Sequence, residues 1–246
     1  MRPLDKKNFN ESITLFSDIH DMPNEEHVIK EDYKDYGRAR KVLLANFGNY
    51  CSYCGIHLSN GALFQTEHIQ PKGLSKYAHL DKKWDNFLLS CGTCNYKKGD
   101  TDVIYSEIHL PHRNNTHLSL LYKEAGVVEV NPDIPQLSQL HAQALINLLK
   151  LDNPDSETDF RREMRRRAWD RAMIYLKKYE AGEYELNAMI ADIKLNDCWS
   201  IWFTVFKEHR EVREALVEQF PGTSRRCFDQ DYNPIPKHPE NADDPI

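Results

Sequence analysis

Cys51-Ser-Tyr-Cys54 and Cys91-Gly-Thr-Cys94 are two cysteine pairs with the same spacing, and they enclose the stretch Thr66-Glu67-His68-Ile69-Gln70-Pro71. In a C-x-x-C pair, two thiolates on one tight turn can reach the same ion, and two such pairs complete a tetrahedral site. The four cysteines therefore predict a structural Zn²⁺ ion. That ion would fasten the two ends of the segment 55–90, which carries its own acid, imidazole and amide groups.

The bulk properties of the chain agree with an intracellular protein. Its 246 residues can form one sizeable domain, or a small domain with a second layer. No stretch approaches the roughly 20 apolar residues needed to span a bilayer. The opening Met-Arg-Pro-Leu-Asp-Lys-Lys lacks the apolar run of a signal peptide. We therefore expect a cytoplasmic location, no membrane contact, and unreactive thiols at Cys198 and Cys227.

The net charge of −6 hides a locally basic segment. Within residues 38–102, the Lys and Arg side chains outnumber the Asp and Glu side chains. This surplus is modest, so we expect phosphate contacts to be few and sensitive to salt. The acidic residues are concentrated elsewhere, in residues 18–35 and in the C-terminal tail.

The region around the cysteine pairs is expected to read helix, strand, loop, strand, helix. Residues 38–47 predict a helix that enters the first pair, with Val42, Leu43 and Phe47 packed against the metal turn. The apolar runs 62–67 and 84–90 predict two short strands. A second helix is expected to open at Asn95, directly after the second pair.

The remaining chain is expected to be mostly helical. Residues 107–133 predict a connector with a strand at 126–130, and residues 134–226 a helical region. Within that region, apolar residues recur at helical spacing over 137–149, 168–176, 186–193 and 199–206. The predicted segments are thus a polar, loosely packed lead-in (1–36), a compact unit (37–106), the connector, the helical region and a disordered tail (227–246).

Over residues 38–102 the chain resembles the HNH (ββα-metal) endonuclease family. The residues that carry the resemblance are Cys51/Cys54, Glu67-His68-Ile69-Gln70-Pro71, Trp84-Asp85-Asn86, Cys91/Cys94-Asn95 and Lys98-Gly99. The opening Met-Arg-Pro and the later Arg113-Asn-Asn-Thr116 are also similar to a group of bacterial HNH proteins. Some members of that group sit beside ATPases in anti-phage systems of the Septu or retron type, so an ATPase is a candidate partner.

The resemblance assigns a role to each motif residue. His68 is expected to be the general base, because an imidazole exchanges protons near neutral pH. Glu67 and Asn95 are expected to hold a catalytic ion. Asn86 corresponds to the middle Asn of the motif and is expected to tie down the loop that positions His68.

The chain departs from the commonest family pattern at two positions. Residue 95 is Asn where many members have a third His, and residue 67 is Glu rather than the frequent Asp. A neutral amide is a weaker ligand than an imidazole. Hard oxygen ligands at an open site favour Mg²⁺ or Mn²⁺ over Zn²⁺ as the catalytic ion.

Basic residues supply the candidate nucleic-acid contacts. Lys72 and Lys98 flank the motif, and His109, His112 and Arg113 follow it. Further along, Arg161-Arg162-Glu-Met-Arg165-Arg166-Arg167 places four guanidinium groups on one helical face, so Arg162, Arg165 and Arg166 could pair with phosphates. The alternative for this cluster is a solvated face paired with nearby acids such as Asp159 and Asp170.

The sequence thus predicts an α+β chain in which a small zinc-stapled ββα unit precedes a mostly helical region. The function it favours is a metal-dependent HNH endonuclease acting on DNA, most readily double-stranded DNA, in restriction or anti-phage defence. One alternative is a non-catalytic zinc module that binds nucleic acid or a partner ATPase. A third is a nuclease toxin directed at RNA.

Overall fold

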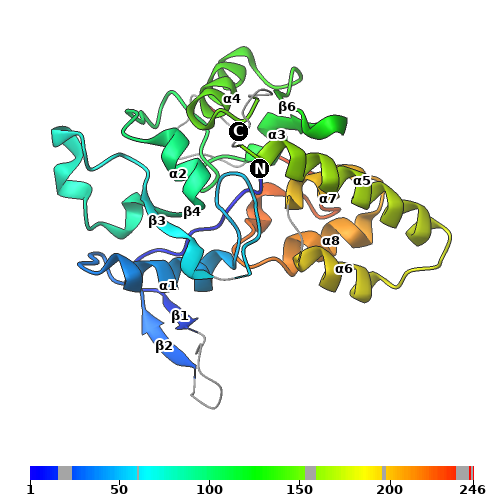
Figure 1. Cartoon of the computed structure of the whole chain (residues 1–246), viewed down its shortest axis with the longest axis horizontal. Coiled ribbons are helices and arrows are strands. Elements are labelled where there is room, and N and C mark those ends of the chain that lie inside the picture. The colour runs from blue at the N-terminus through cyan, green and yellow to red at the C-terminus, as the bar shows by residue number, and fades with distance from the viewer. Residues whose placement is uncertain (16–23, 60, 153–158, 196–197, 237–243, 245) are drawn as a thin grey trace.

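The computed structural model describes residues 1–15, 24–59, 61–152, 159–195, 198–236, 244 and 246. The fold is α+β, as predicted. Three two-stranded antiparallel sheets belong to the first half of the chain, and helices make up most of the second (Figure 1). Among the described residues, no helix is both long and apolar enough to cross a bilayer.

The lead-in is more ordered than the sequence suggested. Strands β1 (Ser12–Leu15) and β2 (Glu25–Val28) form a hairpin that projects from the body of the molecule (Figure 1). The side chains of Met1, Arg2 and Leu4 are buried, and the Arg2 guanidinium donates to the carbonyl oxygens of Phe47 and Pro221. The prediction of a loosely packed lead-in is therefore wrong for residues 1–15, because its first residues fill the space beneath α1.

The zinc-stapled unit is built from α1 (Tyr36–Phe47), β3 (Gln65–His68), β4 (Phe87–Ser90) and α2 (Gly92–Lys98). The two strands pair so that His68 lies opposite Phe87. Both strands begin later than predicted, because residues 61–63 and 84–86 form 3₁₀ turns before them. Helix α2 starts inside the second cysteine pair, where the Cys91 sulfur accepts from the Cys94 backbone N–H.

The connector and the helical region follow. The connector contains α3 (Thr116–Ser119), β5 (Leu120–Tyr122) and β6 (Val128–Val130), and β6 is the strand expected at 126–130. The helices after it are α4 (Gln136–Leu149), α5 (Arg161–Glu180), α6 (Leu186–Lys194), α7 (Trp199–Val205) and α8 (Arg210–Glu218). Helix α5 is longer than the apolar repeat at 168–176, and α8 was not predicted as a separate element. Trp199, Trp202 and Phe203 are buried core residues, as their helical spacing indicates.

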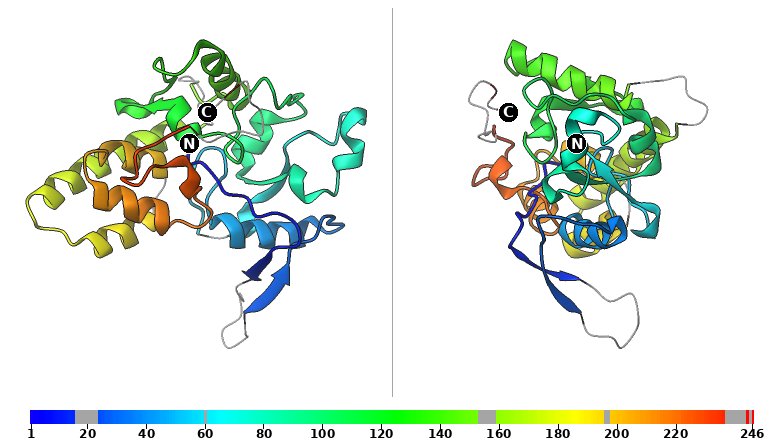
Figure 2. Two further views of the ribbon diagram at one scale, coloured as in Figure 1. Left: turned by 180° about the vertical axis from the view of Figure 1, so that it is seen from behind. Right: turned by 90° about the vertical axis from the view of Figure 1, so that its left-hand side faces the viewer.

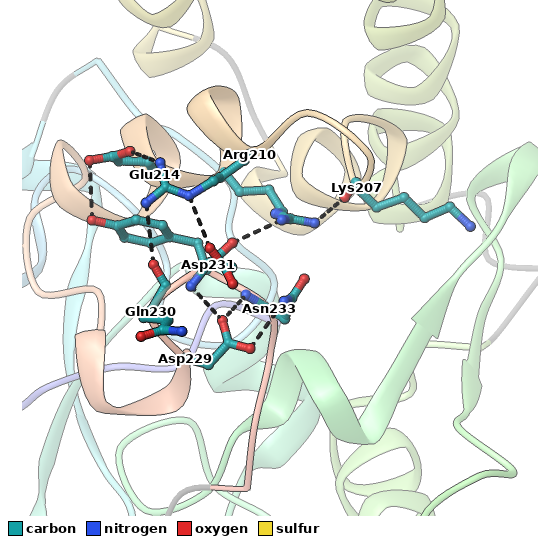
Figure 3. Close-up of polar contacts among 9 residues, drawn as sticks. Lys207, Arg210, Glu214, Asp229, Gln230, Asp231 and Asn233 are labelled. Atoms are coloured by element: carbon teal, nitrogen blue, oxygen red, sulfur yellow. Dashed lines mark hydrogen bonds and ion pairs between the residues drawn. The ribbon is translucent and has the colours of Figure 1, made fainter.

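The described part of the tail is folded, which corrects the prediction of disorder for residues 227–236, 244 and 246. Cys227 and Phe228 are buried. Arg210 of α8 bonds to Glu214 and to Asp231, and Asp229 accepts from Asn233 (Figure 3). Seen from behind, the segment after α8 returns to the middle of the molecule, where both ends of the chain lie (Figure 2).

Residue 244 packs even more deeply. The Asp244 carboxylate is 3% exposed and accepts from Nε2 of His109 at 2.8 Å, from Nδ1 of His141 and from the Ser138 hydroxyl at 2.7 Å. We call this group the His109–Asp244 cluster. It corrects the expectation that His109 could reach DNA, because the His109 side chain is completely buried.

Candidate active site and metal centre

The four predicted zinc ligands come together. One ligand atom from each of Cys51, Cys54, Cys91 and Cys94 lies within 4.8 Å of every other, and three of the four side chains are fully buried. The Sγ atoms of Cys54 and Cys91 are 3.8 Å apart, and the backbone N–H of Cys91 donates to the Cys51 sulfur at 3.3 Å. Four clustered thiolate sulfurs are the donor set of a closed structural zinc site.

Arg161 reaches this centre from the helical region. Its guanidinium is 5% exposed and donates to the Cys94 sulfur at 3.3 Å. The same group pairs with the Asp159 carboxylate and donates to the Leu149 carbonyl oxygen at 2.7 Å. Four thiolates around one Zn²⁺ carry a net charge of −2, so a buried cation beside a sulfur stabilises the centre. The positive end of the α5 dipole lies at the same place.

A second site opens on the other side of α2. A pocket of about 420 Å³ is bounded by β3, α2 and the loop after β3. It is lined by the motif residues Glu67, His68 and Asn95, together with Tyr36, Lys72, Lys98 and Asp100. Residues that are up to 60 positions apart in the sequence thus share one wall, and the ends of the motif meet as the resemblance implied.

His68 is held by two contacts at Asp81. Its Nε2 lies 2.8 Å from the Asp81 carbonyl oxygen and 3.5 Å from the Asp81 carboxylate. A carbonyl oxygen can only accept a hydrogen bond, so Nε2 carries the proton and Nδ1 is the nitrogen that can take one up. The ring edges of Tyr36 and Phe87 pack against the imidazole.

Asn86 bonds to the loop that follows His68. Its side-chain oxygen accepts from the Gln70 backbone N–H at 2.8 Å, and its amide donates to the Gln70 carbonyl oxygen at 2.9 Å. The Asn86 side chain is buried and its backbone oxygen accepts from the Ile69 N–H. These contacts have the form expected of a loop-anchoring residue rather than of a substrate contact.

Glu67 already has two partners in its buried position. Its Oε1 lies 2.8 Å from the Lys98 ammonium, and its Oε2 accepts from the Tyr53 hydroxyl at 2.7 Å. The side chains of Glu67 and Lys98 are 1% and 2% exposed. Lys98 also donates to the His68 carbonyl oxygen at 2.8 Å. The structure therefore places Lys98 inside the site as a structural cation, and not at the surface where it was expected to contact phosphate.

Asn95 and Lys72 occupy the pocket in different ways. The Asn95 amide donates to the Gln65 side chain at 2.5 Å, so its carbonyl oxygen is the atom that can bind an ion. Lys72 is 52% exposed, lies over the Tyr36 ring, and is 3.8 Å from the Asp81 carboxylate. Of the two lysines predicted to contact nucleic acid, only Lys72 is accessible.

The arginine cluster at 161–167 does not form the expected cationic face. Arg165 is buried and donates to the Gly126 and Leu151 carbonyl oxygens at 2.8 Å each. Arg162 donates to the Ala125 carbonyl oxygen, and Arg166 is paired with Glu163 and Asp170. The alternative of local acid pairing thus describes Arg166. Arg162 and Arg165 instead fasten the loop at 124–126 to α5, where a Cβ on Gly126 would lie 2.1 Å from the Arg162 carbonyl oxygen.

Three residues at the site were missed in the sequence. Tyr36, Tyr53 and Asp81 lie outside the motif positions, and each bonds to a motif residue or to its partner. Tyr53 sits between the first two cysteines, so its position in the metal turn could have indicated a buried role. For Tyr36 and Asp81 no spacing rule applies, because they meet His68 only through the folding of a loop.

The geometry defines a zinc-stapled ββα unit with a polar pocket beside the staple. The HNH endonuclease family model matches residues 51–101 of the chain. This segment is accordingly an HNH endonuclease domain, and its four clustered cysteines fit the zinc-stapled type. No curated protein matches the chain.

Proposed function

We propose that the chain is a metal-dependent endonuclease that hydrolyses phosphodiester bonds in DNA, with His68 as the general base. The observation that carries this proposal is the pocket in which His68, Glu67 and Asn95 meet, inside the segment that the HNH family model matches. Water attacks a phosphate anion poorly at neutral pH, so a base that removes its proton accelerates the reaction. Nδ1 of His68 is the atom suited to that task.

The donors at the pocket suit a hard divalent cation. A carboxylate oxygen has two lone pairs, so Glu67 can hold an ion while it keeps its bonds to Tyr53 and Lys98. The Asn95 carbonyl oxygen supplies a second hard ligand, and Mg²⁺ or Mn²⁺ prefers such oxygens. When bound, the ion would stabilise the negative charge that develops on the departing 3′ oxygen.

The chain's own residues prepare this chemistry. The Asp81 carbonyl oxygen fixes the tautomer of His68, and Asn86 holds the backbone at Gln70, two residues beyond the base. Lys72, at the rim, is placed to contact a phosphate of the substrate. Because few cations line the pocket, binding should weaken steeply as salt is raised.

The test is plasmid cleavage by the zinc-loaded protein with added Mg²⁺ or Mn²⁺. His68→Ala should bind DNA normally but cleave it more slowly by roughly 10²–10⁴-fold, because proton transfer is lost. His79→Ala is the matched control, since His79 is exposed on the same loop and lies outside the pocket. Products should carry 5′-phosphate and 3′-hydroxyl ends. Wild-type cleavage by His68→Ala, or undiminished cleavage in excess EDTA with zinc still bound, would contradict the proposal.

One observation favours the rival function, a non-catalytic zinc module that binds nucleic acid or an ATPase. The Glu67 charge is already balanced by Lys98, so the pocket is stable without a further cation. Such a module would bind DNA or its partner and cleave neither DNA nor RNA under any metal condition. A parallel assay on RNA separates the toxin alternative. A role in anti-phage defence with an ATPase partner rests on the sequence resemblance alone.

A further inference from the structure

His68 belongs to a polar network that extends beyond the HNH motif. Tyr36 opens α1, outside the segment matched by the family model, and Asp81 lies on the loop between β3 and β4. The Tyr36 hydroxyl donates to the Asp81 carboxylate at 2.5 Å. Asp81 in turn presents its carbonyl oxygen at 2.8 Å and its carboxylate at 3.5 Å to Nε2 of His68.

The network places a negative charge beside the imidazole. The Tyr36 hydroxyl is the main cause of a lowered pKa at Asp81, and the nearby Lys72 ammonium lowers that pKa further. The carboxylate is therefore ionised at neutral pH. When the imidazole gains a proton from water, the new positive charge forms 3.5 Å from this carboxylate. A fixed charge of opposite sign stabilises such a state without reorganising.

The packing also fixes where the imidazole can lie. The Tyr36 ring contacts the His68 ring edge-on with 5.4 Å between the centroids, while its hydroxyl holds Asp81. The Thr66 hydroxyl donates to the Tyr36 carbonyl oxygen at 2.8 Å, which ties the start of α1 to strand β3. Helix α1, the loop and the strand that carries His68 thus meet at one tyrosine.

We propose that Tyr36 and Asp81 are positioning residues for His68: Asp81 orients the imidazole and stabilises its protonated form, and Tyr36 holds Asp81 in place. This inference rests on the proposed nuclease function and deepens it. It adds to the motif a Tyr–Asp–His arrangement whose first member comes from a helix outside the family's conserved segment.

The experiment compares Asp81→Asn and Tyr36→Phe with wild type in DNA cleavage. Asp81→Asn keeps the shape and still accepts from Tyr36 but removes the charge, and it should lower kcat roughly tenfold or more with KM and melting temperature unchanged. Tyr36→Phe keeps the ring against His68 and should lower kcat by a smaller factor. Asp81→Glu should restore part of the loss seen in Asp81→Asn.

A matched control pair lies nearby. Tyr77 donates to the Asp102 carboxylate at 2.7 Å, which is the same chemistry away from His68. Asp102→Asn and Tyr77→Phe should leave kcat unchanged. Ring ¹⁵N NMR gives a readout apart from activity: His68 should hold its proton on Nε2 in wild type and exchange between tautomers in Asp81→Ala, whose loop has lost its anchor.

The outcomes separate this inference from the function beneath it. If wild type cleaves DNA and His68→Ala does not, but Asp81→Asn keeps wild-type kcat, the positioning proposal is wrong and the nuclease assignment stands. Equal losses in Asp81→Asn and Asp102→Asn would also overturn it, because the effect would then be one of surface charge. If His68→Ala cleaves as wild type does, the proposed function itself fails.

Discussion

At the scale of single residues, the site contains two lysines of opposite character. Lys98 is buried with Glu67, whereas Lys72 is half-exposed at the rim of the pocket. Their sequence contexts do not distinguish them, because both follow motif residues in polar stretches. Burial decides their function: a buried ammonium must be paired, while an exposed one is available to a ligand.

Lys98→Ala should therefore destabilise the protein without the substrate being present. It leaves the Glu67 carboxylate buried without its counter-charge, which costs about 3–5 kcal/mol of the free energy of unfolding. Lys72→Ala is the control and should change that free energy by less than about 0.5 kcal/mol. Denaturant unfolding measures both. Equal stability of the two variants would mean that the Glu67–Lys98 pair does not form.

At the scale of elements, local signals were read correctly and long-range ones were not. Cysteine spacing and apolar periodicity predicted the zinc unit, α4 and the helix at 199–206, because those patterns act within a few residues. The contact between Arg161 and Cys94 joins residues 67 positions apart, and no spacing rule records it. Arginines at helical spacing therefore indicated a DNA-binding face, although Arg161 and Arg165 are buried.

The arginine of α5 should instead affect zinc retention. Arg161→Ala removes the donor to the Cys94 sulfur, so the affinity for zinc should fall by roughly 10–100-fold and zinc should be released faster to a coloured chelator. Wild type should hold about one Zn²⁺ per chain, as a single four-thiolate site requires. Arg167→Ala is the control, since Arg167 is 72% exposed and pairs with Glu163.

A second variant, Arg161→Lys, guards against a simple folding defect. It keeps a cation near the sulfur but loses the planar set of donors, so its release rate should lie between those of wild type and Arg161→Ala. Circular dichroism before chelation checks that α5 is formed in every variant. Identical zinc release from all of them would remove Arg161 from the metal centre.

At the scale of the whole molecule, residues far apart in the chain close over one another. Arg2 bonds to carbonyl oxygens at positions 47 and 221, and Asp244 enters the His109–Asp244 cluster beside α4. Polar composition indicated loose ends for residues 1–36 and 227–246. It failed there because a few buried anchors, such as Leu4, Phe228 and Asp244, outweigh the average character of the segments around them.

The His109–Asp244 cluster should make stability depend on pH. Burial lowers the pKa of His109 in the fold, against the opposing influence of the Asp244 carboxylate, while the neighbouring His141 adds to the lowering. Burial alone would raise the pKa of Asp244, but hydrogen bonds from Ser138 and His141 outweigh it and lower that pKa. The unfolded chain therefore binds protons before the folded one as the pH falls.

The sign and the window follow from these shifts. An unfolded histidine titrates near pH 6.5, so the contribution of His109 is complete above that pH and is lost as the pH falls toward its lower folded pKa. Asp244 adds a loss only below about pH 4. Between pH 7 and 5, stability should thus decline by up to about 1.4 kcal/mol per pH unit for one proton difference.

His109→Gln isolates this effect, because a glutamine amide can donate to Asp244 but does not titrate. The variant should lose less stability than wild type between pH 7 and 5 in urea unfolding, while the two curves run parallel above pH 7. Zinc release on acidification affects both proteins equally and cancels in the difference. If the difference between the two curves is constant from pH 8 to 5, His109 is not held neutral in the fold, and the pH dependence belongs to other groups.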